Sequence, residues 1–258
     1  MGFHSGFITI VGRPNVGKST LMNALVGEKV AIVSNRPQTT RNRIMGVMTR
    51  PEWQIVFLDT PGIHHPRTKL GESMMQSVKD AMDGMDGLLT LVDVTQVGEQ
   101  DRKIVREMGT RISAKTGDGL PDLEAQLVKN LPEGPKYFPD DMMTDQPERQ
   151  ICAELIREKA LLHLRDEVPH GIGVEMMAMN KESDDFMEIH ATIYCERDAH
   201  KGIIIGRHGA MLQQIGTEAR ADIEALLGMH VNLKLWVKVR PDWRNRMDDL
   251  RTLGYDNK

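Results

Sequence analysis

The chain has 258 residues, enough for two domains that each bury a sizeable core. Its net charge of −4 excludes a globally basic nucleic-acid-binding protein, so any contact with nucleic acid has to come from a local basic patch. Cys152 and Cys195 lie far apart, and neither a membrane-spanning run nor a signal-peptide pattern occurs, so we expect a cytoplasmic protein with reduced thiols and neither a disulfide nor zinc.

The first predicted strand, over residues 7–11, leads into Gly-Arg-Pro-Asn-Val-Gly-Lys-Ser from Gly12 to Ser19. This is the phosphate-binding loop pattern, and apolar residues at helical spacing follow it as far as Gly27. The glycines let backbone N–H groups close around phosphate oxygens at a helix N-terminus, with Lys18 between the β- and γ-phosphates. A glycine-rich turn that only connects two elements is the alternative. The predicted nucleotide-binding residues are Gly12, Asn15, Val16, Gly17, Lys18, Ser19 and Thr20.

A polar loop over residues 35–41 follows, at the place where a P-loop GTPase has its first switch. A hydroxyl from this loop reaches Mg²⁺ when the γ-phosphate is present, which makes Thr40 our candidate ligand and Thr39 the second. Both threonines could equally be solvated loop residues.

Residues 44–49 and 53–58 predict two strands in a hairpin, and the second strand ends at Asp59-Thr-Pro-Gly62. The Asp59 carboxylate can hold a water on Mg²⁺, and the Gly62 N–H can sense the γ-phosphate. Asp-x-x-Gly alone is a common turn, but its position after a phosphate loop and an apolar strand is typical of a GTPase. The candidate catalytic residues are Lys18, Thr40 and Gly62, and the candidate metal ligands are Ser19, Thr40 and Asp59.

Ile63 stands where many GTPases have a glutamine that orients water. An apolar side chain cannot position water by hydrogen bonding, so we expect slow intrinsic hydrolysis or another device. His64 and His65 are conceivable replacement bases, but histidines in a mobile switch are more often solvated.

The spacing predicts helices over 71–85 and 100–108, and between them a central parallel strand over 87–93 that is covered on both faces. Ser113, Ala114 and Lys115 then match the loop that touches a guanine ring, but they come only twenty residues after Asp93. A strand-helix-strand unit alone takes ~30 residues.

No Asn-Lys-x-Asp occurs anywhere in the chain, so guanine selectivity lacks its usual aspartate. Either this sequence omits a segment of the protein, joining Met108 or Gly109 directly to Thr110, or the protein itself is shortened. We favour an omission, because a gap inside a parallel sheet would leave backbone groups unpaired.

A leucine-rich helix ends before Pro132 and closes the first predicted domain, residues 1–132, with a doubly wound, mostly parallel α/β sheet. Residues 133–147 form a turn-rich linker. The second predicted domain, residues 148–258, has a helix over 148–164 and strands over 173–179, 186–195 and 231–239.

Gly206-Arg-His-Gly209 lies between two helical segments of this domain, which is the signature of a KH domain, here an α+β domain of type II. Its glycines allow close approach to a sugar-phosphate backbone, Arg207 can neutralise phosphate, and residues 203–205 would floor a groove for unstacked bases. An ordinary helix-turn-helix is the alternative. The candidate RNA-binding residues are Ile205, Gly206, Arg207, His208 and Gly209.

Over nearly its whole length the chain resembles the Era family of GTPases. The segments that carry the resemblance are Gly12–Ser19, Pro37–Arg41, Asp59–Gly62, Ser113–Lys115, Gly206–Gly209, Leu235–Val239 and Leu253–Tyr255. The resemblance implies binding of GTP and GDP with Mg²⁺, binding to the 3′ end of 16S rRNA of the small ribosomal subunit, a role in assembling and maturing that 30S subunit, and loose membrane association. It also suggests Asn15 as a ligand for K⁺. We expect a monomer.

The leading hypothesis is therefore a GTP-hydrolysing switch that controls RNA binding. One alternative is a non-catalytic RNA-binding scaffold with a degenerate nucleotide domain, and another is a membrane-associated signalling GTPase whose C-terminal half binds protein or lipid. Lysines and arginines between Lys234 and Arg251 could extend an RNA surface, but such charges are more often solvated. Trp236 and Trp243 could be base-stacking platforms, but we expect them to pack in the core or at an edge.

Overall fold

The computed structural model describes residues 2–255 with gaps at 37, 63–65, 67 and 94–111. The chain divides into two compact units. The first comprises Met1–Val33, Thr40–His65 and Met74–Asp145, and the second comprises Ser34–Thr39, Pro66–Ser73 and Gln146–Lys258. Two short segments from the first half of the sequence therefore group with the C-terminal half.

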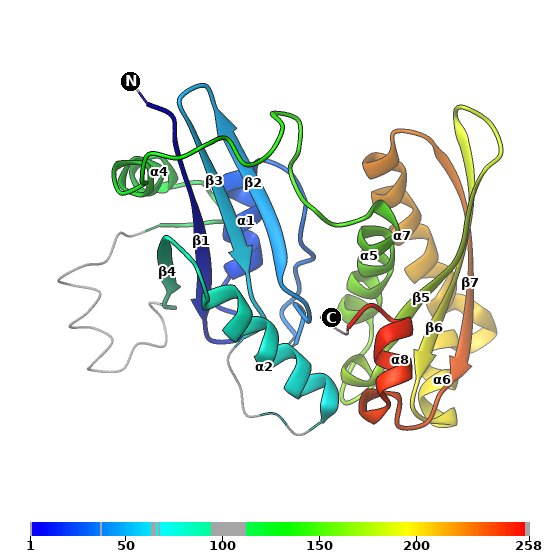
Figure 1. The fold of residues 1–258 in the computed structure, drawn as a ribbon. Helices are drawn as coiled ribbons and strands as arrows, with labels where there is room; N and C mark the ends of the chain where they lie inside the picture. Colours follow the sequence, from blue (N-terminus) through cyan, green and yellow to red (C-terminus); the bar gives the residue numbers. More distant parts are fainter. Residues whose placement is uncertain (1, 37, 63–65, 67, 94–111, 256–258) are drawn as a thin grey trace. The chain divides into compact units, whose positions relative to one another are not determined.

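The first unit is built on a four-stranded sheet in the order β2-β3-β1-β4 (Figure 1). Its strands are β1 (His4–Gly12), β2 (Ile44–Arg50), β3 (Trp53–Asp59) and β4 (Gly87–Leu91). The β1 strand runs parallel to β3 and to β4, while β2 and β3 form the expected antiparallel hairpin. This arrangement confirms the predicted mostly parallel α/β sheet.

Helices pack on both faces of this sheet: α1 (Lys18–Val26) and α4 (Leu120–Lys129) on one, and α2 (Lys69–Met82) on the other. On the first face, Phe57 of the sheet lies in one buried cluster with Leu21 of α1 and Leu123 of α4. On the second face, Val56 clusters with Ala81 of α2. Burial on both faces is why β1 and β3 read as almost continuous apolar runs.

The β4 strand differs from its prediction. It ends at Leu91, and within the described part of the sheet it pairs only with β1. Leu88 is 47% exposed, so the prediction that both faces of this strand are covered is wrong. Within the described residues the strand lies at an edge of the sheet, and the faces of a strand are covered only where helices pack on them. The helix predicted over 100–108 lies outside the described residues.

The second unit contains a three-stranded sheet in the order β5-β6-β7. Its strands are β5 (Gly173–Lys181), β6 (Phe186–Cys195) and β7 (His230–Val239). The β5 and β6 strands are antiparallel, whereas β6 and β7 are parallel. A parallel pair needs a crossover, which here consists of α6 (Asp198–Ile205) and α7 (Ala210–Leu227). This is the predicted KH frame, completed by α5 (Glu148–His163) and α8 (Met247–Thr252).

The two faces of this second sheet differ. Ile189, Ala191 and Ile193 of β6 are fully buried on the face that packs against the helices. Trp243 is also fully buried, and its indole N–H donates to the Gly171 carbonyl at 2.9 Å, which confirms its predicted packing role. Trp236 of β7 instead remains 44% exposed. None of the helices that the structure describes is both long enough and apolar enough to cross a membrane.

Candidate nucleotide site and nucleic-acid interface

The phosphate loop leaves β1 and turns directly into α1. Gly17 caps that helix with a φ of 97°, in the left-handed region that favours glycine. The Lys18 ammonium donates to the carbonyls of Gly12 at 3.4 Å and Arg13 at 3.3 Å, so it spans the loop. Burial lowers the pKa of Lys18, and the nearby Asp59 carboxylate opposes that shift. A buried cation whose hydrogen bonds go to neutral carbonyls is a strong attractor for phosphate.

Three oxygen-bearing side chains meet beside this loop. The Ser19 hydroxyl lies 2.9 Å from the Thr40 hydroxyl and donates to Asp59 Oδ2 at 2.5 Å, and the Thr40 hydroxyl lies 3.5 Å from the same oxygen. The other carboxylate oxygen, Asp59 Oδ1, is buried and has no hydrogen-bond partner among the described residues. Hard oxygen ligands of this kind, with an unsatisfied carboxylate, fit Mg²⁺.

Asp59 is fully buried, and burial raises its pKa to about 6. The Ser19 hydroxyl and the Lys18 charge oppose the shift without cancelling it. A buried carboxylate is costly unless a cation compensates its charge. A divalent cation at this position would keep the carboxylate ionised.

The structure distinguishes the two candidate threonines. The Thr39 hydroxyl donates to the Arg36 carbonyl at 2.6 Å and lies 2.6 Å from the Ser34 hydroxyl, so it is engaged within its own loop. The Thr40 hydroxyl belongs to the oxygen cluster at Ser19. Thr40 therefore has the placement expected of the metal ligand.

The Asp59–Gly62 segment packs tightly against the phosphate loop. Thr60 donates its hydroxyl to the Ile10 carbonyl at 2.9 Å, which ties this segment to β1. A Cβ atom on Gly62 would lie 2.8 Å from the Pro14 Cα, closer than real contacts allow. The backbone of Gly62 is thus in direct contact with the phosphate loop. Ile63, His64 and His65 lie outside the described residues.

The remaining predicted nucleotide residues divide into two groups. Asn15 is exposed at the tip of the loop with a φ of 63°, while Val16 and Thr20 are half-buried beside it. Ser113, Ala114 and Lys115 form a separate turn in which the Ser113 N–H donates to the Asp118 carbonyl at 2.8 Å. Ala114 of this turn packs against the core of the first unit.

The Gly206–Gly209 loop of the second unit is held in a strained conformation. Gly206, His208 and Gly209 have φ values of 73°, 51° and 80°. A Cβ atom on Gly206 would lie 2.6 Å from the Cβ atom of Met211, so only glycine fits there. Arg207 and His208 are exposed, which leaves the Arg207 guanidinium available to a phosphate.

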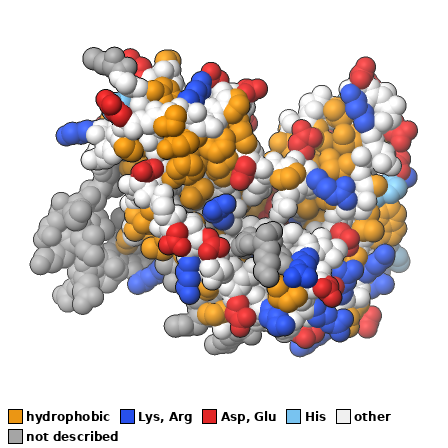
Figure 2. All heavy atoms as spheres, viewed as in Figure 1, with side chains coloured by type: hydrophobic (Ala, Val, Ile, Leu, Met, Phe, Trp, Pro, Cys, Tyr) orange, Lys and Arg blue, Asp and Glu red, His pale blue; other side chains and the backbone are white. Residues whose placement is uncertain are grey.

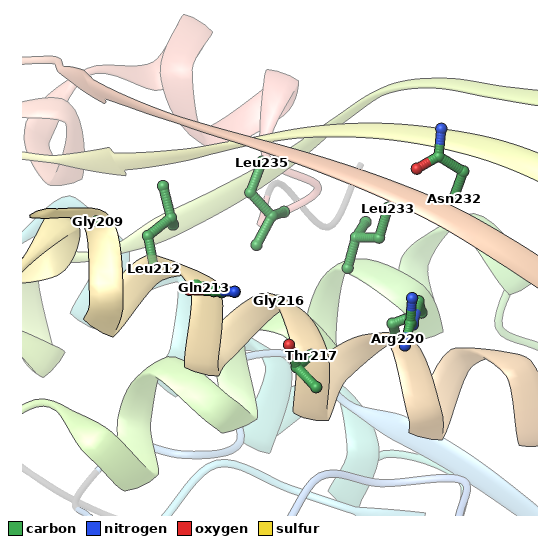
Figure 3. A pocket seen from close by; sticks show the side chains of 9 residues that line it. All are labelled: Gly209, Leu212, Gln213, Gly216, Thr217, Arg220, Asn232, Leu233 and Leu235. Carbon is green, nitrogen blue, oxygen red and sulfur yellow. The ribbon is translucent and has the colours of Figure 1, made fainter.

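A groove with a volume of about 360 Å³ begins at this loop and runs between α7 and β7 (Figure 3). It is lined by Gly209, Leu212, Gln213, Gly216, Thr217, Arg220, Asn232, Leu233 and Leu235. Residues 203–205 do not line it, since Ile204 is fully buried and Ile203 is 50% exposed. The prediction that they floor the groove is wrong: the apolar floor comes from α7 and the inward side of β7, which are distant in sequence.

One further feature, a buried arginine, was missed from the sequence. Arg157 of α5 is fully buried and donates to the Thr39 carbonyl and to Glu154. Burial alone would lower the pKa of Arg157, but Glu154 beside it holds that pKa above its usual value. Figure 2 shows Lys and Arg side chains gathered over α6 and α8 of the second unit, mixed with carboxylates. This is local positive charge on a chain with a net charge of −4.

The loop, the oxygen cluster and the Gly206–Gly209 groove define a P-loop GTPase joined to a KH domain. Residues 7–116 match the family described as 50S ribosome-binding GTPase, and residues 167–244 match the KH domain family. The curated relatives make the assignment more specific. The chain belongs to the Era family of GTPases, and it is a GTPase.

Relatives that align with the chain over nearly their full length support this assignment. The chain is 46% identical to GTPase Era of Ruminiclostridium cellulolyticum, over 99% of this chain and 98% of the relative. It is 47% identical to GTPase Era of Clostridioides difficile, over 99% of this chain and all of the relative. These alignments run over 293 and 296 positions, whereas the chain has 258 residues, so the relatives contain residues that this sequence lacks.

Two solved structures resemble the whole chain, each with a TM-score of 0.91 and 37% identity over 98% of it. One, covered to 99%, is Era in complex with MgGDPNP and nucleotides 1506–1542 of 16S ribosomal RNA. The other, covered to 100%, is a variant of Aquifex aeolicus Era bound to GDP and AlF4⁻. Relatives of this chain thus bind guanine nucleotides, and one of them also binds 16S rRNA.

Proposed function

We propose that this chain is a GTP-hydrolysing switch that binds 16S rRNA through its KH domain and assists assembly and maturation of the 30S subunit. The observation that carries the proposal is the presence of two sites in one chain, a phosphate and metal site and a groove beside the KH loop. The first is the cluster of Ser19, Thr40 and Asp59 beside the phosphate loop, and the second is the groove between α7 and β7. A related protein binds a GTP analogue and 16S rRNA together.

The residues present suit phosphoryl transfer to water. The Lys18 ammonium and the loop N–H groups stabilise charge that develops on the γ-phosphate as water attacks in line. Ser19 and Thr40 would hold Mg²⁺, which when bound neutralises charge on the β- and γ-phosphate oxygens. Gly62, packed on Pro14, would respond to the γ-phosphate through its N–H.

Asn15 is a candidate K⁺ ligand at the exposed tip of the loop. A monovalent cation there would supply the positive charge that an arginine finger gives other GTPases. Replacing KCl by NaCl should then slow hydrolysis, and Asn15→Ala should abolish this dependence on the cation. Equal rates in both salts would contradict the assignment.

The coupling of nucleotide to RNA is tested by measuring RNA affinity with GDP and with a non-hydrolysable GTP analogue bound. The proposal expects different affinities, because ordering of the loops that carry Thr40 and Gly62 changes with the γ-phosphate. Lys18→Ala, which weakens nucleotide binding, should remove the difference. Equal RNA affinities of the two nucleotide states in the wild type would contradict the proposal that the nucleotide controls RNA binding.

The missing Asn-Lys-x-Asp favours a second hypothesis for this sequence, a non-catalytic RNA-binding assembly factor whose nucleotide domain is a degenerate scaffold. Equilibrium binding of GDP, ADP and XDP separates the two. A site with buried hydrogen bonds to guanine rejects other bases by ~10⁴-fold or more. Base-blind binding would favour the scaffold, and subunit assembly should then tolerate Lys18→Ala.

The cytoplasmic location, the loose membrane association and the monomeric state stay predictions. Sedimentation of the purified protein tests the monomeric state, and cell fractionation tests the location and the membrane association.

Introducing Arg207→Asp with His208→Asp should abolish RNA binding and leave membrane recovery unchanged. If this double variant still binds RNA, the C-terminal unit contacts RNA elsewhere or serves another partner.

A further inference from the structure

The second unit has an open sheet face besides the groove. Side chains alternate along β7, so that Val231 and Val237 are buried while Lys234, Trp236 and Lys238 are exposed. On the neighbouring β6, Ile189 and Ala191 are fully buried. Of the other parity, Glu188 and His190 are half-buried, whereas Thr192 and Tyr194, which pair with Trp236 and Lys238, are buried. The exposed side chains therefore share the face that the helices leave open.

These side chains form an ordered arrangement, which we call the strand platform: His190, Lys234, Trp236 and Lys238. The His190 and Trp236 rings meet edge to face, with centroids 5.2 Å apart and planes at 71°. His190 also lies 2.5 Å from Glu188, and Lys234 donates to the same carboxylate at 2.9 Å. The contact fixes the orientation of the indole and still leaves Trp236 44% exposed.

The charge of the strand platform is positive. Lys234 shares Glu188 with His190, whereas Lys238 forms no ion pair with any carboxylate in the part of the chain that the structure describes. Two lysines thus flank one exposed indole, and the Glu188 carboxylate lies on the Lys234 side, where Glu188 pairs with Asn232 in the sheet. Positive charge next to an open aromatic ring is the arrangement that single-stranded nucleic acid recognises, with stacked bases and neutralised phosphates.

The strand platform is continuous with the groove through one strand. Figure 3 shows Leu233 and Leu235 of β7 pointing toward α7, while Trp236, the next residue after Leu235, is 44% exposed. Because β7 is an edge strand in the sheet order, a nucleic-acid strand that leaves the groove crosses only β7 to reach Trp236. Neighbouring strands lie ≈ 4.8 Å apart, so this crossing is short on the scale of a nucleotide.

We propose that the strand platform is a second binding site for single-stranded RNA. Unpaired nucleotides that leave the groove cross the edge of β7, one base stacks on the Trp236 indole, and Lys234 and Lys238 contact the phosphates on either side. This inference rests on the proposed RNA binding, because the strand platform would bind further nucleotides of an RNA that the groove already holds. It assigns to Trp236 a role in RNA binding instead of edge packing.

The test compares two labelled RNAs in the full chain, a short strand that fills only the groove and the same strand with ~4 unpaired nucleotides added at either end. Trp236→Ala should weaken binding of the long RNA by about 5- to 150-fold, since one stacked base contributes that much affinity. Binding of the short RNA should stay unchanged. Trp236→Phe keeps an aromatic face and should retain most of the affinity. It should also lose the quenching of tryptophan emission that the long RNA causes in wild type.

A charge variant tests the phosphate contacts. Lys238→Glu should reduce the salt dependence of binding to the long RNA by about one phosphate contact. Lys129→Glu on the exposed side of α4 makes the same change in charge and is the matched control. Thermal unfolding of each variant shows whether the second unit stays folded.

The outcomes separate this inference from the proposed function. If both RNAs bind Trp236→Ala as well as wild type, or if both are weakened equally, the strand platform is not a second RNA site, whatever else this face contacts. If the short RNA fails to bind wild type, or binds Arg207→Asp equally well, the proposed groove itself is wrong. Length-dependent loss with Trp236→Ala, rescued by Trp236→Phe, supports the strand platform.

Discussion

The hydroxyl oxygens of Ser19 and Thr40 lie 2.9 Å apart, although one residue begins helix α1 and the other belongs to the loop before β2. Both lie beside the buried carboxylate of Asp59, whose second oxygen has no partner among the residues that the structure describes. The loop that we expect to respond to nucleotide is thereby brought to the helix that we expect to hold the phosphates. The first prediction follows from this contact.

Thr40→Val should lower the Mg²⁺-dependent affinity for a GTP analogue by about tenfold or more, because the cation loses an oxygen ligand. GDP should be affected less, since the switch hydroxyl joins the cation when the γ-phosphate is present. Titration with fluorescent nucleotides in Mg²⁺ and in EDTA measures both effects. Thr39→Val is the matched control, and an equal loss in the two variants would contradict the assignment of Thr40.

Gly62→Ala should impair binding of the GTP analogue, because the new methyl group would lie 2.8 Å from the Pro14 Cα. The clash is with backbone, so one of the two segments has to move. Gly87→Ala is the control in the same unit, since its Cβ atom would meet Ile8 at an ordinary 3.7 Å. Nucleotide titration and hydrolysis rates should change for Gly62→Ala and stay near wild type for Gly87→Ala.

Gly206→Ala should destabilise the KH loop more than Gly209→Ala. Both glycines have positive φ values, so alanine at either position costs about 1–2 kcal/mol in backbone strain. At Gly206 the Cβ atom would also collide with Met211, whereas at Gly209 nothing lies within 4 Å. Thermal unfolding and RNA affinity measure the effect of each variant. A larger loss of stability for Gly209→Ala would mean that the contact between Gly206 and Met211 does not determine the stability of the loop.

Arg157→Met should lower the free energy of unfolding by about 3–5 kcal/mol, because it leaves Glu154 and the Thr39 carbonyl without their buried partner. Denaturant unfolding with Arg251→Met as the control measures this. Arg251 is 56% exposed and lies 3.8 Å from Asp248, so its loss should matter little. Similar midpoints for the two variants would show that the Arg157 contacts are not stabilising.

Native Cys152 and Cys195 should react slowly with thiol reagents at pH 8. Both thiols are buried, and burial raises the pKa of Cys152 to about 12 and that of Cys195 above its usual value. The thiolate is the reactive form, and its fraction grows only as the pH approaches the pKa. Both thiols should react quickly once the protein is unfolded. Fast native reaction would mean that the second unit opens locally.

The phosphate loop, the Asp59–Gly62 segment and the KH loop could be predicted from the sequence because their chemistry depends on local backbone geometry. Gly17 and Gly206 are recognisable since few other residues adopt their φ values, and the flanking strand or helix shows as a run of apolar residues.

Other features depend on which distant segments meet, and no local pattern encodes that. Thr39 and Thr40 are neighbours of the same type, and only the tertiary structure places one hydroxyl at Ser19 and the other at Arg36. Covering of a strand face depends on which helices pack on it, so the apolar run around Leu88 did not reveal that this side chain is 47% exposed. The groove and the strand platform arise for the same reason. Side chains on opposite sides of β7 acquire different surroundings only when α7 packs against one face and the other stays open.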